Sequence, residues 1–196
     1  TWEEIQPTHP ECVSFFNTYP PHPYKINNYS ENILDIKKHF PDYEFKLAFD
    51  VGANVGQSVN TLFALSENLY LHCFEPSPDA FENLKTNYNE HSRIFLNNFA
   101  LSDKLGISRF INSGSSVENR LTDLNEGNID VQIKSLNNYC DERKITHIDY
   151  LKIDTEGHEL EVLKGSSNIL GKTYFIETEV SMNLYNKFHT PMLDII

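Results

Sequence analysis

The sequence has few cysteines, and they form no pattern. Cys12, Cys73 and Cys140 are odd in number and far apart, with neither a CxxC pair nor metal-ligand spacing. This excludes a thiolate metal site and a disulfide framework as the basis of the fold. The histidines and acids show no metal-ligand spacing either. We therefore expect no bound metal and a reducing, cytoplasmic setting.

Long apolar runs and basic clusters are also missing. No run approaches the roughly 18 apolar residues that typify a membrane span, and the first residues lack the basic start and apolar stretch of a secretory signal. The 16 Lys and Arg face 28 Asp and Glu, which gives a net charge of −12. Phosphate backbones are bound by clustered Lys and Arg. We therefore expect no membrane and no nucleic-acid partner, and leave the oligomeric state open.

Residues 1–45 differ in composition from the rest of the chain. Six of the nine prolines fall there, interleaved with aromatic residues. Proline at this density is incompatible with a continuous helix or a central strand, yet exposed aromatic side chains are costly. We expect residues 1–45 to form a structural arm or a lid over a binding site. One helix is predicted within it, from an N-cap at Ser30 to Phe40, ended by Pro41.

Residues 46–196 alternate between strand and helix patterns. Alternation of this kind predicts one Rossmann-like α/β domain, with a mostly parallel sheet and helices on both faces. The predicted strands are 46–51, 69–74, 93–99 and 148–153, a last one at 174–180, and two weaker ones at 107–111 and 129–133. The predicted helices are 57–65, 79–88, 136–143 with Ser135 as N-cap, and 158–170.

A glycine turn joins the first predicted strand to the first helix. It reads FDVGANVG over residues 49–56, and Glu75 follows about 20 residues later, directly after the second strand. Glycines let the backbone turn sharply and approach a ligand. In a βαβ unit such an acid lies beside the turn and accepts the hydroxyl protons of a ribose. Together they predict an adenosine-containing ligand.

The turn does not match a pyrophosphate cradle. The dinucleotide pattern GxGxxG would need glycines where Asn54 and Gln57 stand. Asp50 would also repel a phosphate, while favouring a ligand with a positive charge and an ammonium group. S-adenosylmethionine carries both and has no phosphate, so it fits better than NAD. An NAD- or nucleotide-sugar-binding oxidoreductase and a non-catalytic module with the same fold stay open as alternatives.

At this point the sequence resembles the FkbM family of S-adenosylmethionine-dependent methyltransferases. The similar motifs are FDVGANVGQS (49–58), FEPSP (74–78), NFALSD (98–103), a GSS loop (114–116), YLKIDTEGHELEVLKG (150–165) and FIE (175–177). The resemblance implies a class I methyltransferase sheet and O-methylation of a sugar or small-molecule hydroxyl. The chain departs from the family by an Asn at position 137, and the sequence shown stops before the antiparallel strand pair that usually closes this sheet.

The resemblance also implies roles for individual residues. The methionine part of the cofactor would lie within the first turn, the ribose at Glu75, the adenine beside the end of the third strand, and the transferred methyl opposite Asp154. The implied cofactor-binding residues are Asp50, Gly52, Ala53, Asn54, Gly56, Glu75, Pro76, Asn98, Phe99, Ala100 and Asp154.

The segment from Asp154 to Glu159 offers the candidates for catalysis. Methyl transfer to a hydroxyl needs two aligned partners and a group that orients or accepts the proton. Asp154 ends an apolar strand, where burial of a carboxylate costs free energy and so indicates a function. Glu156 and His158 follow it. We predict that these three are catalytic. Glu159 is explained by the preference for acids in the first turn of a helix.

Overall fold

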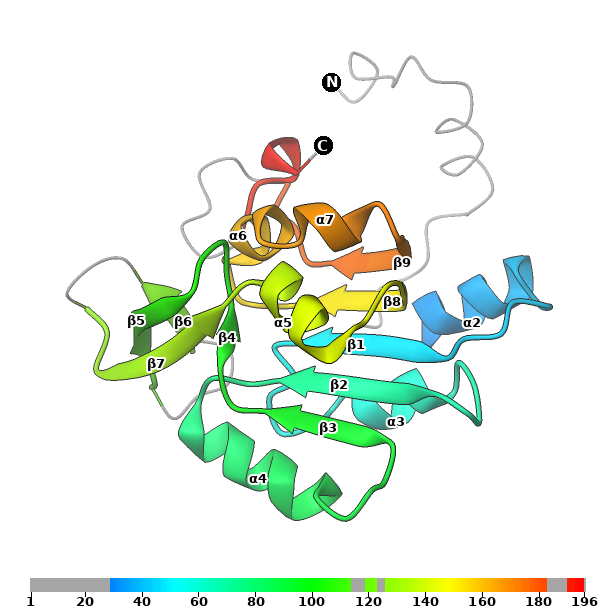
Figure 1. The fold of residues 1–196 in the computed structure, drawn as a ribbon, viewed down its shortest axis with the longest axis horizontal. Coiled ribbons are helices and arrows are strands. Elements are labelled where there is room, and N and C mark those ends of the chain that lie inside the picture. The colour runs from blue at the N-terminus through cyan, green and yellow to red at the C-terminus, as the bar shows by residue number, and fades with distance from the viewer. Residues whose placement is uncertain (1–28, 114–118, 123–125, 183–189, 196) are drawn as a thin grey trace.

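The computed structural model describes residues 29–113, 119–122, 126–182 and 190–195, which form two sheets with helices around the larger one (Figure 1). The larger sheet has the order β3-β2-β1-β8-β9, and all its neighbouring strands are parallel. Its strands are β1 (Leu47–Val51), β2 (Tyr70–Phe74), β3 (Ile94–Asn97), β8 (Ile148–Ile153) and β9 (Thr173–Thr178). The predicted Rossmann-like α/β fold is confirmed. Among the described residues no helix is long and apolar enough to cross a membrane.

Helices cover both faces of the larger sheet. One apolar core joins it to α2 (Tyr29–His39), α3 (Val59–Phe63) and α4 (Pro78–Tyr88). The other joins it to α5 (Leu136–Arg143), α6 (Glu159–Lys164) and α7 (Ser167–Leu170). Every residue of β8 is buried, as expected of a central strand covered on both faces. A short 3-10 helix, η2 (Met192–Asp194), lies near the end of the described chain.

The smaller sheet was not predicted as a separate unit. It contains β4 (Ala100–Leu101), β5 (Gly106–Ile111), β6 (Arg120–Thr122) and β7 (Ile129–Lys134) in the order β4-β7-β5-β6. The two weaker predicted strands are therefore real, and they pair with each other antiparallel. The strand predicted over 93–99 is wrong at its end, because the chain leaves the larger sheet after Asn97 and enters the smaller one at Ala100.

Two predicted helices differ from the structure in their limits. The helix expected over 158–170 is divided into α6 and α7 at Gly165, which lies against the backbone of Ser102. A Cβ at position 165 would stand 2.0 Å from the Ser102 carbonyl oxygen. The N-cap expected at Ser30 is also wrong, since α2 already begins at Tyr29.

The segment before β1 packs on the larger sheet where it is described. Ile33 and Phe45 belong to the core, and the Tyr43 hydroxyl donates to Oδ1 of the buried Asp149 at 2.7 Å. The other oxygen of Asp149 accepts from the backbone N–H groups of Lys46 and Leu47. Residues 1–28 lie outside the described residues, so the arm or lid and its boundary at residue 45 stay a prediction.

Candidate functional site

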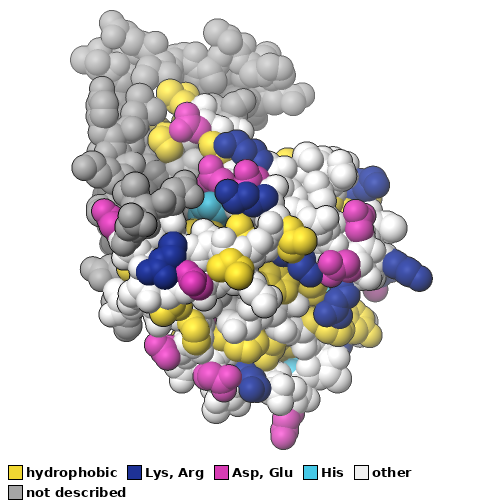
Figure 2. Space-filling view, turned by 60° about the vertical axis from the view of Figure 1, so that its left-hand side comes forward, with side chains coloured by type: hydrophobic (Ala, Val, Ile, Leu, Met, Phe, Trp, Pro, Cys, Tyr) yellow, Lys and Arg dark blue, Asp and Glu magenta, His cyan; other side chains and the backbone are white. Residues whose placement is uncertain are grey.

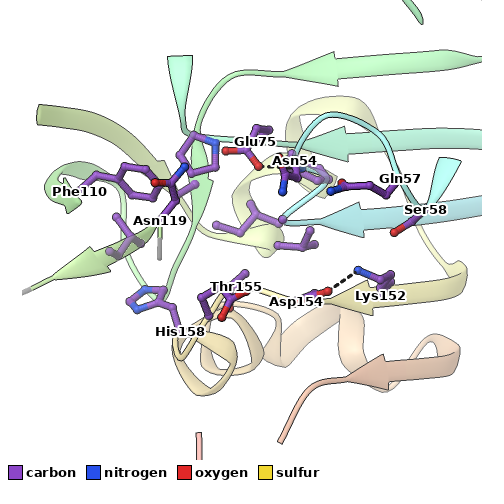
Figure 3. A pocket seen from close by; sticks show the side chains of 18 residues that line it. Asn54, Gln57, Ser58, Glu75, Phe110, Asn119, Lys152, Asp154, Thr155 and His158 are labelled. Carbon is purple, nitrogen blue, oxygen red and sulfur yellow. Dashed lines mark hydrogen bonds and ion pairs between the residues drawn. The ribbon is translucent and has the colours of Figure 1, made fainter. Parts of the chain in front are cut away.

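A pocket opens at the carboxyl edge of the larger sheet, where ligands bind in open α/β folds (Figure 3). Three loops of this sheet and the facing surface of the smaller sheet line it. The loop after β1 contributes Gly52, Asn54, Gln57 and Ser58; the loop after β2 contributes Glu75 and Pro76; β8 and its loop contribute Lys152, Asp154, Thr155, Glu156 and His158; the smaller sheet and its connections contribute Ala100, Leu101, Phe110, Asn119 and Leu121.

The turn after β1 is shaped by a close backbone contact. Gly52 has φ +84°, and a Cβ there would stand 1.8 Å from the carbonyl oxygen of Asp154. Only glycine fits this conformation and this approach. The N–H groups of Gly52 and Ala53 both donate to the carbonyl of Phe74 at 3.0 Å. The turn is therefore held against the ends of both β2 and β8, which fixes the floor of the pocket.

Glu75 is a buried carboxylate held by backbone donors. Its side chain accepts from the N–H of Asn54 at 2.8 Å and from the N–H of Ser77 at 2.7 Å. Burial raises the pKa of Glu75 to about 7, although the two backbone hydrogen bonds act in the opposite direction. Each carboxylate oxygen carries a second lone pair, so Glu75 can accept hydroxyl protons from a ligand while these bonds persist.

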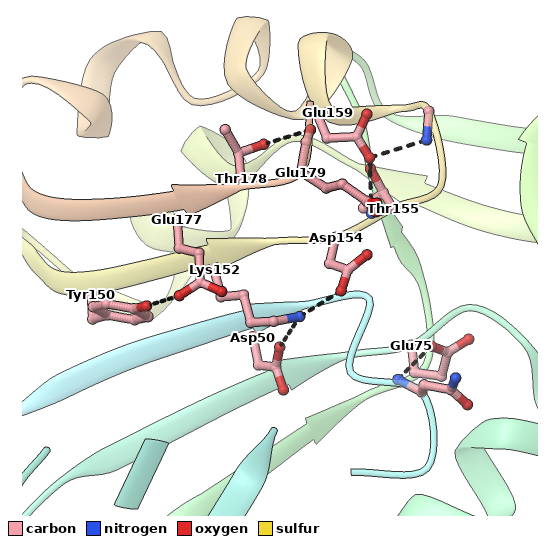
Figure 4. A network of polar contacts seen from close by, with 12 residues as sticks. Asp50, Glu75, Tyr150, Lys152, Asp154, Thr155, Glu159, Glu177, Thr178 and Glu179 are labelled. Atoms are coloured by element: carbon pink, nitrogen blue, oxygen red, sulfur yellow. Dashed lines mark hydrogen bonds and ion pairs between the residues drawn. The ribbon is translucent and has the colours of Figure 1, made fainter. Parts of the chain in front are cut away.

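A row of charged residues crosses three neighbouring strands beneath the pocket (Figure 4). Asp50, Lys152 and Glu177 are register partners on β1, β8 and β9. Lys152 Nζ lies 2.9 Å from Oδ2 of Asp154 and 3.6 Å from Oδ1 of Asp50. Asp50 is fully buried, and its oxygens accept no hydrogen bond from the described residues. Burial raises its pKa, which the nearby Lys152 opposes.

The loop after β8 is organised by the buried carboxylate of Glu159. Its Oε1 accepts from the N–H groups of Thr155 and Gly157 and from the Thr155 hydroxyl, at 2.9–3.0 Å. Its Oε2 accepts from the Thr190 hydroxyl at 2.6 Å. Burial would raise the pKa of Glu159, but these hydrogen bonds outweigh it and hold the pKa below its usual value. Glu159 therefore anchors the loop that carries Asp154. This role goes beyond the favourable interaction of an acid with the first turn of a helix, which was expected from the sequence.

His158 lies away from Asp154. Figure 3 shows the imidazole at the end of the pocket near Phe110, whereas Asp154 points toward Lys152 on the other side of Thr155. The Nε2 atom of His158 is 3.0 Å from the Ser102 hydroxyl, and Nδ1 is 3.7 Å from Oε2 of Glu161. Both ring nitrogens thus have partners within the protein.

Residues 50–196 match the family described as the methyltransferase FkbM domain. The chain belongs to the FkbM methyltransferase family. It is 29% identical over 150 residues to the 2-O-methyltransferase NoeI of Sinorhizobium fredii, covering 67% of this chain. It is 28% identical over 151 residues to the hexuronic acid methyltransferase AglP of Haloferax volcanii, covering 76% of this chain. Each match spans 62% of the relative's length.

The likeness of this FkbM domain to solved structures is looser. One of them, precorrin 8W decarboxylase of Methanobacterium thermoautotrophicum, is 15% identical with a TM-score of 0.37. The match covers 78% of this chain and 62% of that chain.

Most residues predicted to bind the cofactor line the pocket of the FkbM domain, but five do not. Those that line it are Gly52, Asn54, Glu75, Pro76, Ala100 and Asp154, with the catalytic candidates Glu156 and His158. Asp50 lies beneath it, Ala53 is in the core, and Gly56 faces Tyr88. Asn98 donates to the Glu75 carbonyl, and the Phe99 ring packs on Phe74 and Tyr139. Their contact with a cofactor stays a prediction.

The fold assembles pocket residues that no local motif indicated. Phe110 and Leu121 come from the smaller sheet, and Asn119 comes from the chain just before β6. The sequence shows only two apolar residues within a polar stretch there. Gln57, Ser58 and Lys152 also line the pocket; they lie within the motifs at 49–58 and 150–165 but were not among the predicted site residues.

Three carboxylates gather beside the pocket. Asp154, Glu156 and Glu179 each place one oxygen within 4.8 Å of the others, close enough for a divalent cation to bridge. Acidic groups at this spacing also occur without an ion, and the prediction of no metal stays a prediction.

The face turned forward in Figure 2 carries mixed charge. Lys and Arg side chains alternate with Asp and Glu across its described part, and no continuous basic band gathers there. Binding to a phosphate backbone needs such a band. This distribution agrees with the net charge of −12 and gives no support to a nucleic-acid substrate.

Proposed function

We propose that this FkbM domain binds S-adenosylmethionine and transfers its methyl group to a hydroxyl of a sugar or another small molecule. The observation that carries the proposal is the buried carboxylate of Glu75, held by two backbone N–H groups between an apolar and an acidic end of one pocket. A ribose needs such an acceptor. The turn beside it lacks the glycines of a pyrophosphate cradle, which favours a nucleoside over a dinucleotide.

The charges of the pocket suit a sulfonium nucleoside. Asp50 and Asp154 flank Lys152 at one end, so two carboxylates face one ammonium group. A cationic ligand would offset the remaining negative charge, whereas a pyrophosphate would add to it. The Asp50 carboxylate accepts no hydrogen bond from the described residues, so its negative charge favours a positively charged ligand at this end of the pocket.

Asp154 is the residue best placed for the chemistry. When bound, the cofactor would supply an electrophilic methyl group to the acceptor oxygen and would leave as S-adenosylhomocysteine. The acceptor hydroxyl loses its proton, and the Asp154 carboxylate would orient that hydroxyl and take the proton. Lys152, 2.9 Å away, keeps the carboxylate in place. Glu156 would bind a further hydroxyl, and we assign His158 to the opposite end of the pocket.

The proposed acceptor class rests on the polar groups and on the relatives. Asp154, Thr155 and Glu156 present oxygen acceptors side by side, as sugar hydroxyls require. The names of the two relatives describe a 2-O-methyltransferase and a hexuronic acid methyltransferase. Because acids outnumber bases at this edge, we propose a neutral sugar rather than a uronic acid.

Calorimetric titration of the chain with S-adenosylmethionine and S-adenosylhomocysteine tests the cofactor. We expect both to bind, Glu75→Ala to abolish binding without unfolding, and Glu82→Ala, which removes an exposed acid from α4, to leave it intact. Binding of NAD in place of either ligand would refute the proposal and favour an oxidoreductase.

Transfer itself is tested with radiolabelled cofactor and a panel of methyl glycosides of glucose, mannose, fucose and glucuronic acid. We expect label on a neutral glycoside. Cofactor binding without transfer to any sugar would favour a non-catalytic module, and transfer to the glucuronide alone would overturn the proposed acceptor charge.

A further inference from the structure

The smaller sheet presents a pair of apolar side chains to the pocket. Phe110 on β5 and Leu121 on β6 are register partners in an antiparallel ladder, so they lie side by side on one face of the sheet. Both line the pocket. Phe110 also packs with Ala100, Val131 and Ile133 in the core of this sheet, and Leu121 packs against the same cluster. Both side chains are therefore held in place by the apolar core of the smaller sheet.

This wall stands at the apolar end of the pocket. Phe74, Pro76, Ala100 and Leu101 line the same cavity. In Figure 3, Phe110 and Asn119 lie on one side of Glu75, and Gln57, Ser58 and Lys152 lie on the other. A ligand whose ribose is held at Glu75 must send its base one way and its charged tail the other. The charged tail belongs at the acidic end, beside Asp154 and above the buried Asp50, which leaves the apolar end for the base.

The side chains of the loop after β3 are held by contacts within the protein. The half-buried Phe99 ring packs against Phe74 and Tyr139. The Asn98 amide donates to the carbonyls of Glu75 and Pro76. These contacts hold both side chains at the strand ends, beside the wall that Phe110 and Leu121 form.

Polar contacts fix the smaller sheet to the ribose side of the pocket. The Ser77 hydroxyl donates to Oδ1 of Asn112 at 3.0 Å, and Nδ2 of Asn112 donates to Oδ2 of Asp79 at 3.0 Å. Asn112 and Asn128 exchange two more hydrogen bonds between the ends of β5 and β7. The residue that holds the Glu75 carboxylate, Ser77, therefore also holds the wall in register with it.

We propose that Phe110 and Leu121 form the wall against which the purine base of the cofactor packs, so that the smaller sheet is half of the nucleoside site. The inference rests on the proposed function, because it takes the ligand to be an adenosine derivative. A flat base gains most from packing on an aromatic ring and a branched aliphatic side chain, with little demand for hydrogen bonds.

Two variants and a matched control test the wall by calorimetry. Leu121→Ala and Phe110→Leu shorten it while keeping apolar residues in the sheet, and Ile107→Ala alters an exposed residue of the same strand β5. We expect the two wall variants to bind S-adenosylhomocysteine and 5′-methylthioadenosine about tenfold more weakly than the wild type, since base stacking contributes about 1–3 kcal/mol. The control should stay within about twofold.

A ligand without a base separates a lost wall from a damaged fold. S-ribosylhomocysteine keeps the ribose and the amino-acid tail but carries no purine. The wall variants should bind it as the wild type does, whereas a distorted protein would lose affinity for all three ligands alike.

Equal affinity of wall variants and wild type for S-adenosylhomocysteine, or equal losses for ligands with and without the base, overturns this inference alone. Failure of the wild type to bind S-adenosylhomocysteine and 5′-methylthioadenosine would instead overturn the proposed function and this inference with it.

Discussion

The raised pKa of Glu75 makes cofactor binding depend on pH near neutrality. Burial brings this pKa from its usual 4.5 to about 7, while acceptance of two ribose hydroxyls requires the carboxylate form. Lowering the pH from roughly 8 to roughly 6 reduces the ionised fraction from about nine-tenths to about one-tenth. We therefore expect the affinity for S-adenosylhomocysteine to fall about tenfold over this range. At pH 7 binding should release about half a proton.

The same shift has a consequence for stability without ligand. The folded-state pKa lies above the unfolded value, so the contribution of Glu75 is fully present below about pH 4.5 and is lost as the pH rises through about 7. Its size is about 3 kcal/mol, since each pKa unit corresponds to about 1.4 kcal/mol. Glu75→Gln cannot ionise, and it should keep its stability over this window.

Calorimetry in buffers of different ionisation enthalpy measures the released proton, and urea denaturation between roughly pH 5 and 8 measures the stability. Glu75→Gln is the control for every other titrating group, Asp50 included. The reasoning is refuted if wild type and Glu75→Gln show the same pH dependence of affinity, or if binding at pH 7 releases no proton in either.

Three further predictions concern the charged residues around β8. Lys152→Met should lower the free energy of unfolding in urea by about 3–5 kcal/mol, because it leaves Asp50 buried without its counter-ion. The double variant Lys152→Met/Asp50→Asn should recover most of that loss. If it recovers none, Lys152 and Asp50 are not an ion pair. Asp154→Asn should reduce turnover about 100-fold, a larger loss than its loss of cofactor affinity; equal losses of both would leave Asp154 with a role in cofactor binding alone. Glu159→Gln should lower the free energy of unfolding by about 1–3 kcal/mol. In the wild type, the stabilisation by Glu159 is present above its unfolded pKa and is lost as the pH falls through its depressed folded-state pKa.

The larger sheet could be predicted from the sequence because its strands are short apolar runs that need no partner to be recognised. The run over 148–153 is buried along its whole length, and Glu75 follows a strand at the distance that a βαβ unit dictates. The sharp turn at Gly52 was also predicted, but the close approach that requires its glycine is that of the Asp154 carbonyl, which the sequence did not indicate.

The smaller sheet and the helix break depend on contacts that local patterns do not carry. Phe110 and Leu121 become neighbours only through antiparallel pairing across a loop. The break after α6 coincides with the contact of Gly165 with Ser102, which is far away in the sequence. The gathering of Glu179 with Asp154 likewise depends on the pairing of β9 with β8. The periodicity of apolar residues predicts single helices and strands. The pairing of strands and the contacts between distant segments depend on tertiary packing, which this periodicity does not encode.

The contact between Gly165 and Ser102 joins the two sheets at a point outside the pocket. Ser102 directly follows β4, and its N–H donates to the carbonyl of Lys134 at the end of β7. A methyl group at position 165 would meet the Ser102 carbonyl and displace the root of the smaller sheet. The packing of the smaller sheet against the larger one therefore depends on the lack of a side chain at position 165, a residue that does not line the pocket.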